Sequence, residues 1–219
     1  MSGQTSQLDA LGRPATRRDA VRNYHRVVAA AREVLGESGA EASMEEIAAR
    51  AGVGIGTVYR RFASKEALID ELLRLAADEV LCAAERALER TGGQGLEELL
   101  RAIGQSFADH ARYASLLLER RRDTAAGRRI RAAIDELTRR AAASGTVRPD
   151  VTASDVMALI WAMRGLIQAT GDGAPEAWPR FLGIHLAGLR AADGPIRADP
   201  APAAARPPRG TRPARRSAG

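Results

Sequence analysis

The sequence is short of the residues that make disulfides and membrane spans. Cys82 is the only cysteine, which excludes an internal disulfide and fits a reducing compartment. The longest uninterrupted apolar run, residues 156–163, falls far short of the roughly 20 residues that cross a bilayer. The N-terminal residues lack the apolar core of a signal peptide. We therefore expect a cytoplasmic protein in which Cys82 is a small core residue.

Aromatic side chains and strand-forming patterns are also scarce. Only 4% of the 219 residues are aromatic, whereas 45% are hydrophobic, and alanine and leucine dominate. Alanine and leucine lose little side-chain entropy in a helix, and no sustained alternation of apolar and polar residues marks a strand. The sequence therefore predicts an all-α protein of about nine helices.

Apolar residues at three- and four-residue spacing, broken by glycine and proline, set the expected boundaries. A flexible arm is expected over residues 1–17. Helices are predicted from Asp19 to Gly36, from Ser43, from about Ile55, from Ser64 to about Arg90, from Leu96 to Phe107, and over residues 113–120, 127–143, 152–170 and 176–191.

Positive charge is concentrated at the C-terminus. The chain carries a net charge of +6, and Lys65 is the only lysine among its 33 basic residues. Residues 193–219 hold six arginines against two aspartates, so +4 of the net charge lies there. This segment is rich in proline and alanine and cannot bury enough apolar surface to offset its ordering entropy. We expect this segment to be a disordered tail. Because most of the net charge lies in the tail, nucleic-acid binding must be inferred from local charge and not from the net charge of the chain.

Residues 43–68, SMEEIAARAGVGIGTVYRRFASKEAL, place two short helical patterns on either side of a glycine. Ser43 and Glu46 have the spacing of a capping box at the start of the first helix. Gly52 stands where the chain must turn sharply, because glycine accepts a positive φ without strain. A helix as short as the second does not persist alone, so the first must hold it. Residues 43–62 thus have the pattern of a helix-turn-helix.

The outer side of the second helix carries groups suited to DNA. Thr57 can touch a base edge, and Tyr59 carries a hydroxyl that reaches a phosphate. Lys65 adds its ammonium to the free amides at the start of the next helix. The alternatives are packing on a neighbouring helix for Tyr59 and plain solvated charge for Arg60 and Arg61. The predicted DNA-binding residues are Ser43, Gly54, Gly56, Thr57, Tyr59, Arg60 and Lys65.

The same stretch closely resembles the DNA-binding domain of the TetR family of transcriptional regulators. The shared elements are Ile-Ala, Ala-Gly-Val, Gly-Thr-aliphatic-Tyr, Phe and Lys-Glu-Ala-Leu, and the resemblance covers about residues 19–79. It implies an all-helical dimer with a larger C-terminal domain that binds an effector. It also implies phosphate contacts for Tyr59 and Lys65, and places Gly56 and Thr57 near bases. Gly54 departs from the family, since many members have serine there.

The C-terminal domain is expected over residues 80–192. Candidate residues for lining an effector pocket are bulky or polar groups on inward helix faces: Phe107, His110, Leu117, Ile134 and Trp161. Core or dimer packing is the alternative for Trp161 and its neighbours. The last two helices are expected to form the dimer interface, through Trp178, Phe181, Ile184 and Leu189.

These observations predict a DNA-binding transcriptional regulator and not an enzyme. No nucleophile, base or metal group converges, and the three histidines lack ligand spacing, so we expect no cofactor and no metal. The expected protein is a repressor that binds a palindromic operator as a homodimer and is released by a small-molecule effector. Its expected partners are double-stranded operator DNA, a second copy and the effector, at the bacterial nucleoid and without a membrane. The alternative is an effector-independent or architectural DNA-binding protein.

Overall fold

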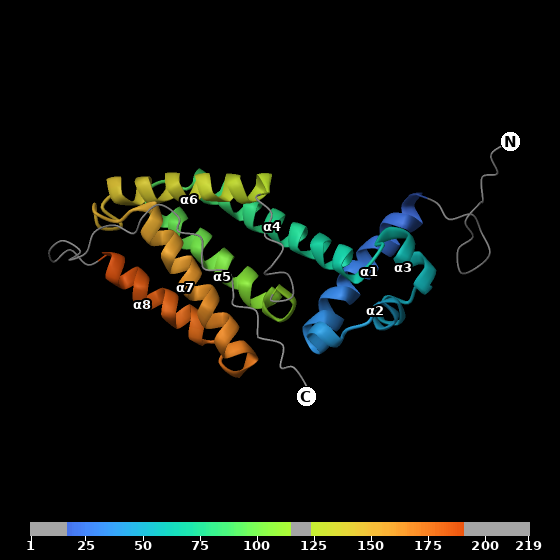
Figure 1. Cartoon of the computed structure of the whole chain (residues 1–219). Coiled ribbons are helices and arrows are strands. Elements are labelled where there is room, and N and C mark those ends of the chain that lie inside the picture. The colour runs from blue at the N-terminus through green and yellow to red at the C-terminus, as the bar shows by residue number, and fades with distance from the viewer. Residues whose placement is uncertain (1–16, 115–123, 191–219) are drawn as a thin grey trace, which may run out of the picture. The chain divides into compact units, whose positions relative to one another are not determined.

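The computed structural model describes residues 17–114 and 124–190, and their secondary structure is entirely helical, as predicted (Figure 1). The two short 3-10 turns are η1 (Gly39–Glu41) and η3 (Gly171–Gly173). The α-helices are α1 (Arg17–Ser38), α2 (Met44–Ala51), α3 (Ile55–Arg61), α4 (Lys65–Glu89), α5 (Gln94–Ala114), α6 (Ala125–Ala143), α7 (Ala153–Thr170) and α8 (Ala177–Arg190).

Several expected helix ends differ from the observed ones by one or two residues, and one differs by more. α1 continues past Gly36 and is followed at Gly39 by a positive φ of 55°. α5 runs on to Ala114, so the separate helix expected over residues 113–120 begins inside α5. The rest of that expected helix lies outside the described residues, as do residues 1–16 of the predicted arm and the predicted tail from residue 193.

The chain divides into two compact units. The first contains α1, α2, α3 and the part of α4 that ends at Ala76. The second begins at Ala77 and contains the rest of α4, α5 as far as Ala111, and α6 to α8. Because α4 is one uninterrupted helix, it belongs to both units.

The core of the first unit joins the apolar faces of its helices. α1 packs against α2, and α2 packs against α3. Ala48 is small and buried on α2, which allows α3 to approach closely, and Val58 is the one fully buried side chain of α3. The other members lie at helical spacing, as an amphipathic helix requires. They include Val27, Ala31, Val34, Leu35, Ile47, Ala51, Leu68 and Leu72.

The core of the second unit draws on α4 to α8. Two helical glycines permit close approaches in this core. A Cβ at Gly95 would overlap the carbonyl oxygen of Ala87, and a Cβ at Gly104 would overlap the ring of Trp178. The buried set includes Leu96, Leu99, Leu100, Ile103, Ile134, Leu137, Ile160, Met163, Leu182 and Leu186.

The expectation that Cys82 is a core residue is wrong, because its side chain is exposed on α4. The nearest buried residue before it on α4 is Ala76 and the nearest after it is Ala84, which shows that α4 turns a different face inward at this point. Among the described residues, no helix combines the length and apolar character needed to cross a bilayer.

Candidate nucleic-acid interface

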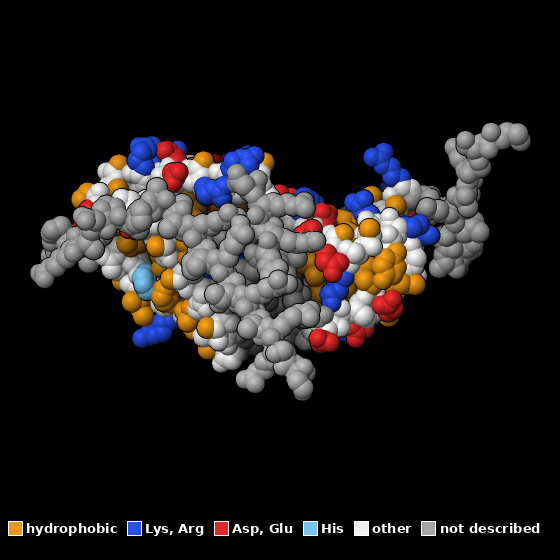
Figure 2. Space-filling view, in the orientation of Figure 1, with side chains coloured by type: hydrophobic (Ala, Val, Ile, Leu, Met, Phe, Trp, Pro, Cys, Tyr) orange, Lys and Arg blue, Asp and Glu red, His pale blue; other side chains and the backbone are white. Residues whose placement is uncertain are grey.

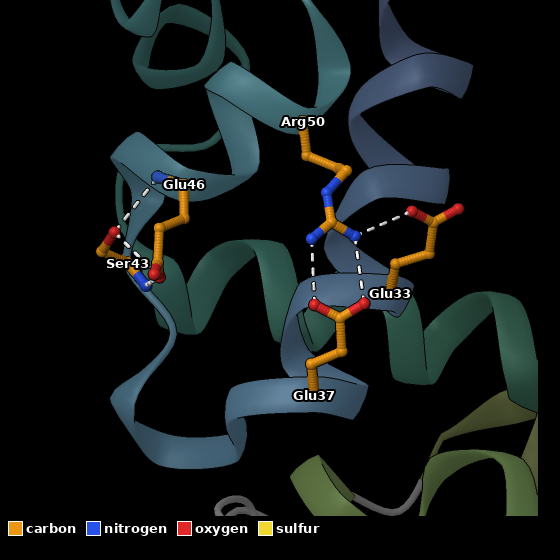
Figure 3. Close-up of polar contacts among 5 residues, drawn as sticks. All are labelled: Glu33, Glu37, Ser43, Glu46 and Arg50. Atoms are coloured by element: carbon orange, nitrogen blue, oxygen red, sulfur yellow. Dashed lines mark hydrogen bonds and ion pairs between the residues drawn. The ribbon is translucent and has the colours of Figure 1, made fainter.

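The turn before α2 is fixed by the predicted capping box (Figure 3). The Ser43 hydroxyl accepts a hydrogen bond from the Glu46 amide at 3.1 Å, and the Ser43 amide donates to the Glu46 carboxylate at 2.8 Å. Two amides that the helix start leaves unpaired are thereby satisfied. Ser43 therefore orders the helix-turn-helix whether or not it also contacts DNA.

The turn between α2 and α3 depends on Gly52, as predicted. Gly52 adopts a left-handed conformation, with φ 60° and ψ 40°, and its amide donates to the end of α2. Its carbonyl oxygen accepts a hydrogen bond at 3.0 Å from the guanidinium of Arg26, on α1. A Cβ at position 52 would overlap that guanidinium. The backbone conformation is what favours glycine here, whereas the end of the flexible Arg26 side chain could shift to admit a Cβ.

A surface ion-pair cluster adds to the contact between α2 and α1 (Figure 3). Arg50 donates to Glu37 through two nitrogens, at 3.1 and 2.9 Å, and to Glu33 at 3.2 Å. The hydrogen bonds from Arg50 lower the pKa of Glu37. All three side chains are largely exposed, so water screens much of this attraction.

α3 presents one face to the core and leaves the other open. Val58 is fully buried, whereas 46% of the Tyr59 surface is exposed, which rules out packing of Tyr59 in the core. A Cβ at Gly54 or Gly56 would meet no atom within 4 Å. At these two glycines the backbone of the start of α3 can approach another molecule closely, while the Ile55 side chain between them is 37% exposed.

Thr57 and Arg60 are coupled on the outer face of α3. The Arg60 guanidinium donates to the Thr57 hydroxyl at 2.9 Å. The Thr57 hydroxyl can still donate its own hydrogen, and the guanidinium retains further donors. The pair thus offers several hydrogen-bond donors at one place. The sequence alone does not indicate the hydrogen bond between Arg60 and Thr57.

Lys65 has a structural role that the sequence did not suggest. Its ammonium donates to the carbonyl oxygen of Ala42 at 2.7 Å, across the loop that precedes α2. An ammonium has three donors, so this bond is compatible with a phosphate contact. Ser64 caps α4 beside it, accepting from the Ala67 amide at 3.2 Å.

A polar cluster missed by the sequence reasoning holds the end of α3. The Tyr24 hydroxyl donates to Glu71 at 2.5 Å, and Arg74 donates to the same carboxylate at 2.8 and 2.9 Å. Arg61 lies 5.0 Å from the centre of the Tyr24 ring. The contacts join three helices, α1, α3 and α4, so periodicity within one helix could not reveal them.

The cluster shifts the pKa values of two of its members. The hydrogen bonds from Arg74, together with the Tyr24 hydroxyl, lower the pKa of Glu71 to about 2. Burial and the nearby Glu71 raise the pKa of Tyr24. Glu71 therefore stays ionised, and Tyr24 stays protonated as its donor, at neutral pH.

The described pocket candidates of the second unit occupy three different environments. Ile134 is buried in the core, and His110 is 6% exposed, with its Nδ1–H donating to the Ser106 carbonyl oxygen at 2.6 Å. Phe107 is only partly buried and packs against the core, and Trp161 is also partly buried. Leu117 lies outside the described residues.

The four candidates for a dimer interface also differ in exposure. Trp178, Phe181 and Leu189 are partly buried against the core of their own chain. Ile184 is 58% exposed on the outward face of α8. Of the four, Ile184 is the one most accessible to a second molecule.

Comparison with known proteins follows the same division of the chain. Residues 27–72 match the family described as bacterial regulatory proteins, tetR family. Residues 93–191 match the family described as transcriptional regulator SbtR-like, C-terminal domain. Both descriptions concern regulators, and neither names an enzyme.

Two solved structures resemble the chain over most of its length. The TetR transcription regulatory protein from Mycobacterium vanbaalenii is 30% identical, with a TM-score of 0.60, over 80% of this chain and 99% of that one. A TetR transcriptional regulator from Streptomyces coelicolor is 28% identical, with a TM-score of 0.59, over 76% of this chain and 97% of that one. No curated protein matches the chain significantly.

The helix-turn-helix and the all-helical second unit define a DNA-binding regulator of transcription. The chain belongs to the TetR family. Members of this family bind DNA through the helix-turn-helix and typically act as dimers that respond to small molecules.

Proposed function

We propose that the protein is a homodimeric repressor, which binds a near-palindromic operator through α3 and is released by a small-molecule effector. The observation that carries the proposal is the open face of α3. There an exposed Tyr59, the open positions Gly54 and Gly56, and the coupled Thr57–Arg60 pair lie outside the core, in which Val58 of the same helix is buried. A protein that acts on an operator works at the bacterial nucleoid.

Each group on this face has a role that fits its chemistry. Thr57 and Arg60 are suited to base edges, since an arginine can donate two hydrogen bonds to a guanine. Tyr59 and Lys65 are suited to phosphates, which fix the position of the protein without reading sequence. Ser43 lies at the start of α2, where a phosphate would meet free amides and a positive dipole end.

The outward faces of α7 and α8 support the homodimer. Small residues recur on them at helical spacing, and Ile184 lies among them. A Cβ at Gly165, Gly183 or Gly188 would meet no atom of the described residues within 4 Å. Such faces allow two helices to approach closely, as in a four-helix bundle. The small exposed residues are Ala158, Ala162, Gly165 and Ala169 on α7, and Gly183, Ala187 and Gly188 on α8.

Effector release would act through α4, which belongs to both units. Lys65 stands at its first residue and Glu71 two turns further on. A tilt of α4 would therefore move the phosphate contact and the hydrogen bond that Glu71 accepts from Tyr24, whose ring Arg61 of α3 contacts. A typical coupling of about 1–3 kcal/mol would weaken operator binding by roughly 5–150-fold. Operator must then weaken effector binding by the same factor.

A titration of the protein against duplexes from DNA flanking its own gene, and against random duplexes, tests the proposal. We expect one flanking duplex to bind at least ~1,000-fold more tightly than random DNA at physiological salt. The alternative, an architectural protein that uses its charge alone, would show little preference among duplexes. Equal affinities for all duplexes would therefore contradict the proposal and favour that alternative.

A further inference from the structure

Arg164 is a charged residue in an apolar helix. The only other charged side chain of α7, Asp155, closes a capping box with Thr152. Arg164 is partly buried, and its guanidinium carbon lies 5.7 Å from the centre of the Phe107 ring on α5. Burial lowers the pKa of Arg164, and no carboxylate among the described residues offsets this effect.

Arg164 differs from the other partly buried arginines of the second unit. In the part of that unit which the structure describes, Arg140 pairs with Glu136 at 2.6 Å, and Arg148 pairs with Asp150 at 2.8 Å. Arg164 has neither an ion pair nor a hydrogen bond within residues 17–114 and 124–190. The exposed arginines along α6 are solvated, as their place on the surface shows (Figure 2). A guanidinium beside an aromatic face, partly shielded from water, attracts an external anion more strongly than a fully solvated one does.

The surroundings of Arg164 are apolar. Phe107 continues the inner face of α5 that carries Leu100 and Ile103. Those two side chains are buried, whereas Phe107 is only partly buried. Met157 lies two turns before Arg164 on the same flank of α7 and is also partly buried. An apolar wall with one cation suits an amphipathic anion, whose chain packs on the wall while its head group meets the guanidinium.

We propose that Arg164 binds the carboxylate of an amphipathic small molecule, whose apolar part lies against Phe107 and the core of the second unit. The inference rests on the proposed function in taking this molecule as the effector. Guanidinium and carboxylate form two parallel hydrogen bonds, which an alcohol or an ammonium of equal chain length cannot reproduce. The site therefore selects the head group through Arg164 and accepts the chain through apolar contact.

The first experiment compares head groups on the full-length protein. Sodium decanoate, 1-decanol and decyltrimethylammonium are titrated below their micellar concentrations, with tryptophan fluorescence as the readout. Both tryptophans report on the site, since Trp161 lies three residues before Arg164 and Trp178 contacts Gly104, one turn before Phe107. We expect decanoate to bind at least ~10-fold more tightly than decanol, and the ammonium to bind least. Equal binding of decanoate and decanol, or no binding of decanoate, would overturn the proposal.

The second experiment changes the arginine. Arg164→Met keeps an apolar stem of similar length and should weaken decanoate by roughly 10–100-fold, while leaving decanol unchanged. Arg164→Lys retains the charge without the two-pronged geometry and should give a smaller loss. Arg139→Met, which removes an exposed arginine paired with Glu136, is the matched control and should change nothing. Decanoate binding that survives in folded Arg164→Met would sink the proposal.

Two further measurements, of the oligomeric state and of operator affinity, distinguish this proposal from a subunit contact of Arg164 and from the proposed effector release. If the guanidinium instead pairs with a carboxylate of a second copy, light scattering will show that Arg164→Met dissociates the dimer, and the ligand role falls. If decanoate binds through Arg164 but leaves operator affinity unchanged, the carboxylate site stands and effector release fails. If another compound releases operator while decanoate shows no preference over decanol, the proposed function stands and the carboxylate site fails.

Discussion

The glycines of the helical regions fall into two groups that the structure explains differently. In the interior of the second unit, Gly95 and Gly104 are required because a Cβ would overlap a neighbouring atom of the same chain. At the start of α3 and on the outward faces of α7 and α8, a Cβ would meet nothing within 4 Å. Contacts within the chain explain the first group, whereas nothing within residues 17–114 and 124–190 explains the second.

An open glycine alone does not indicate a partner, since Gly36 on α1 is equally unobstructed. The other open glycines differ from Gly36 in the exposed side chains that lie beside them. Gly54 and Gly56 stand beside an exposed Tyr59, and the glycines of α7 and α8 stand in rows of small residues that include an exposed Ile184. We infer that DNA covers the first region and a second copy of the chain covers the other.

The largest effect is expected in the interior. Gly95→Ala and Gly104→Ala should each destabilise the protein by about 1–3 kcal/mol, because the added methyl group overlaps a carbonyl oxygen or an aromatic ring. Urea unfolding measures the change. Gly36→Ala, on an unobstructed helical position, is the control and should stabilise by up to about 1 kcal/mol. Equal effects at the three positions would remove the distinction between interior and open glycines.

On the α7 and α8 faces, a bulky side chain should separate the subunits and spare the fold. Gly183→Leu should raise the dimer dissociation constant at least ~10-fold, because it holds the two helices apart. Sedimentation over a range of concentrations measures this constant. Gly36→Leu should leave it unchanged, and an unaltered dimer in Gly183→Leu would show that this face is not the interface.

At the start of α3, the same change should act on DNA binding. Gly56→Leu should weaken operator binding by ~10-fold or more, since the side chain would stand between the backbone and the duplex. Its thermal stability should not fall, because leucine favours the helix more than glycine does. Fluorescence anisotropy with operator DNA measures the affinity. A drop in stability that matched the loss of binding would mean that the position faces the protein rather than DNA.

The sequence could predict features that depend on neighbouring residues, but not contacts between residues far apart in the chain. The capping box at Ser43 and the turn at Gly52 are local, so spacing and backbone preference were sufficient to predict both. The bond from Lys65 to Ala42 joins residues far apart in the chain, and no periodicity encodes it. Cys82 was misplaced because the burial of a small residue depends on which face its helix turns inward.

Lys65→Ala should give a mixed result, because Lys65 serves both the fold and, by our proposal, the phosphate. Losing the phosphate contact should weaken operator and random duplexes alike and reduce the salt slope by about 1 per subunit. Losing the bond to Ala42 should lower stability by about 1 kcal/mol. Titrations at several salt concentrations, alongside thermal unfolding, separate the two. An altered sequence preference with an unchanged slope would contradict the phosphate role.

The smallest effect concerns the support of α3 by Glu71. Its pKa is lowered from 4.5 to about 2 in the folded protein, so its stabilising contribution is complete above about pH 4.5 and is lost as the pH falls towards 2. Glu71→Gln should cost on the order of 1 kcal/mol at pH 7 and reduce the loss of stability over that acid range. Urea unfolding at pH 7 and at pH 3 measures both. Parallel pH profiles for the native protein and the variant would show that Glu71 contributes nothing.

The central claim is that two copies of α3 read one near-palindromic site. Selection from a random duplex library, followed by sedimentation of the complex with the enriched sequence, tests it most directly. We predict two half-sites in inverted orientation, with centres that place the two copies of α3 about 34–36 Å apart or a multiple of that distance, and an even number of chains on each duplex. Enrichment of no sequence, or one chain bound to a single half-site, would contradict the account.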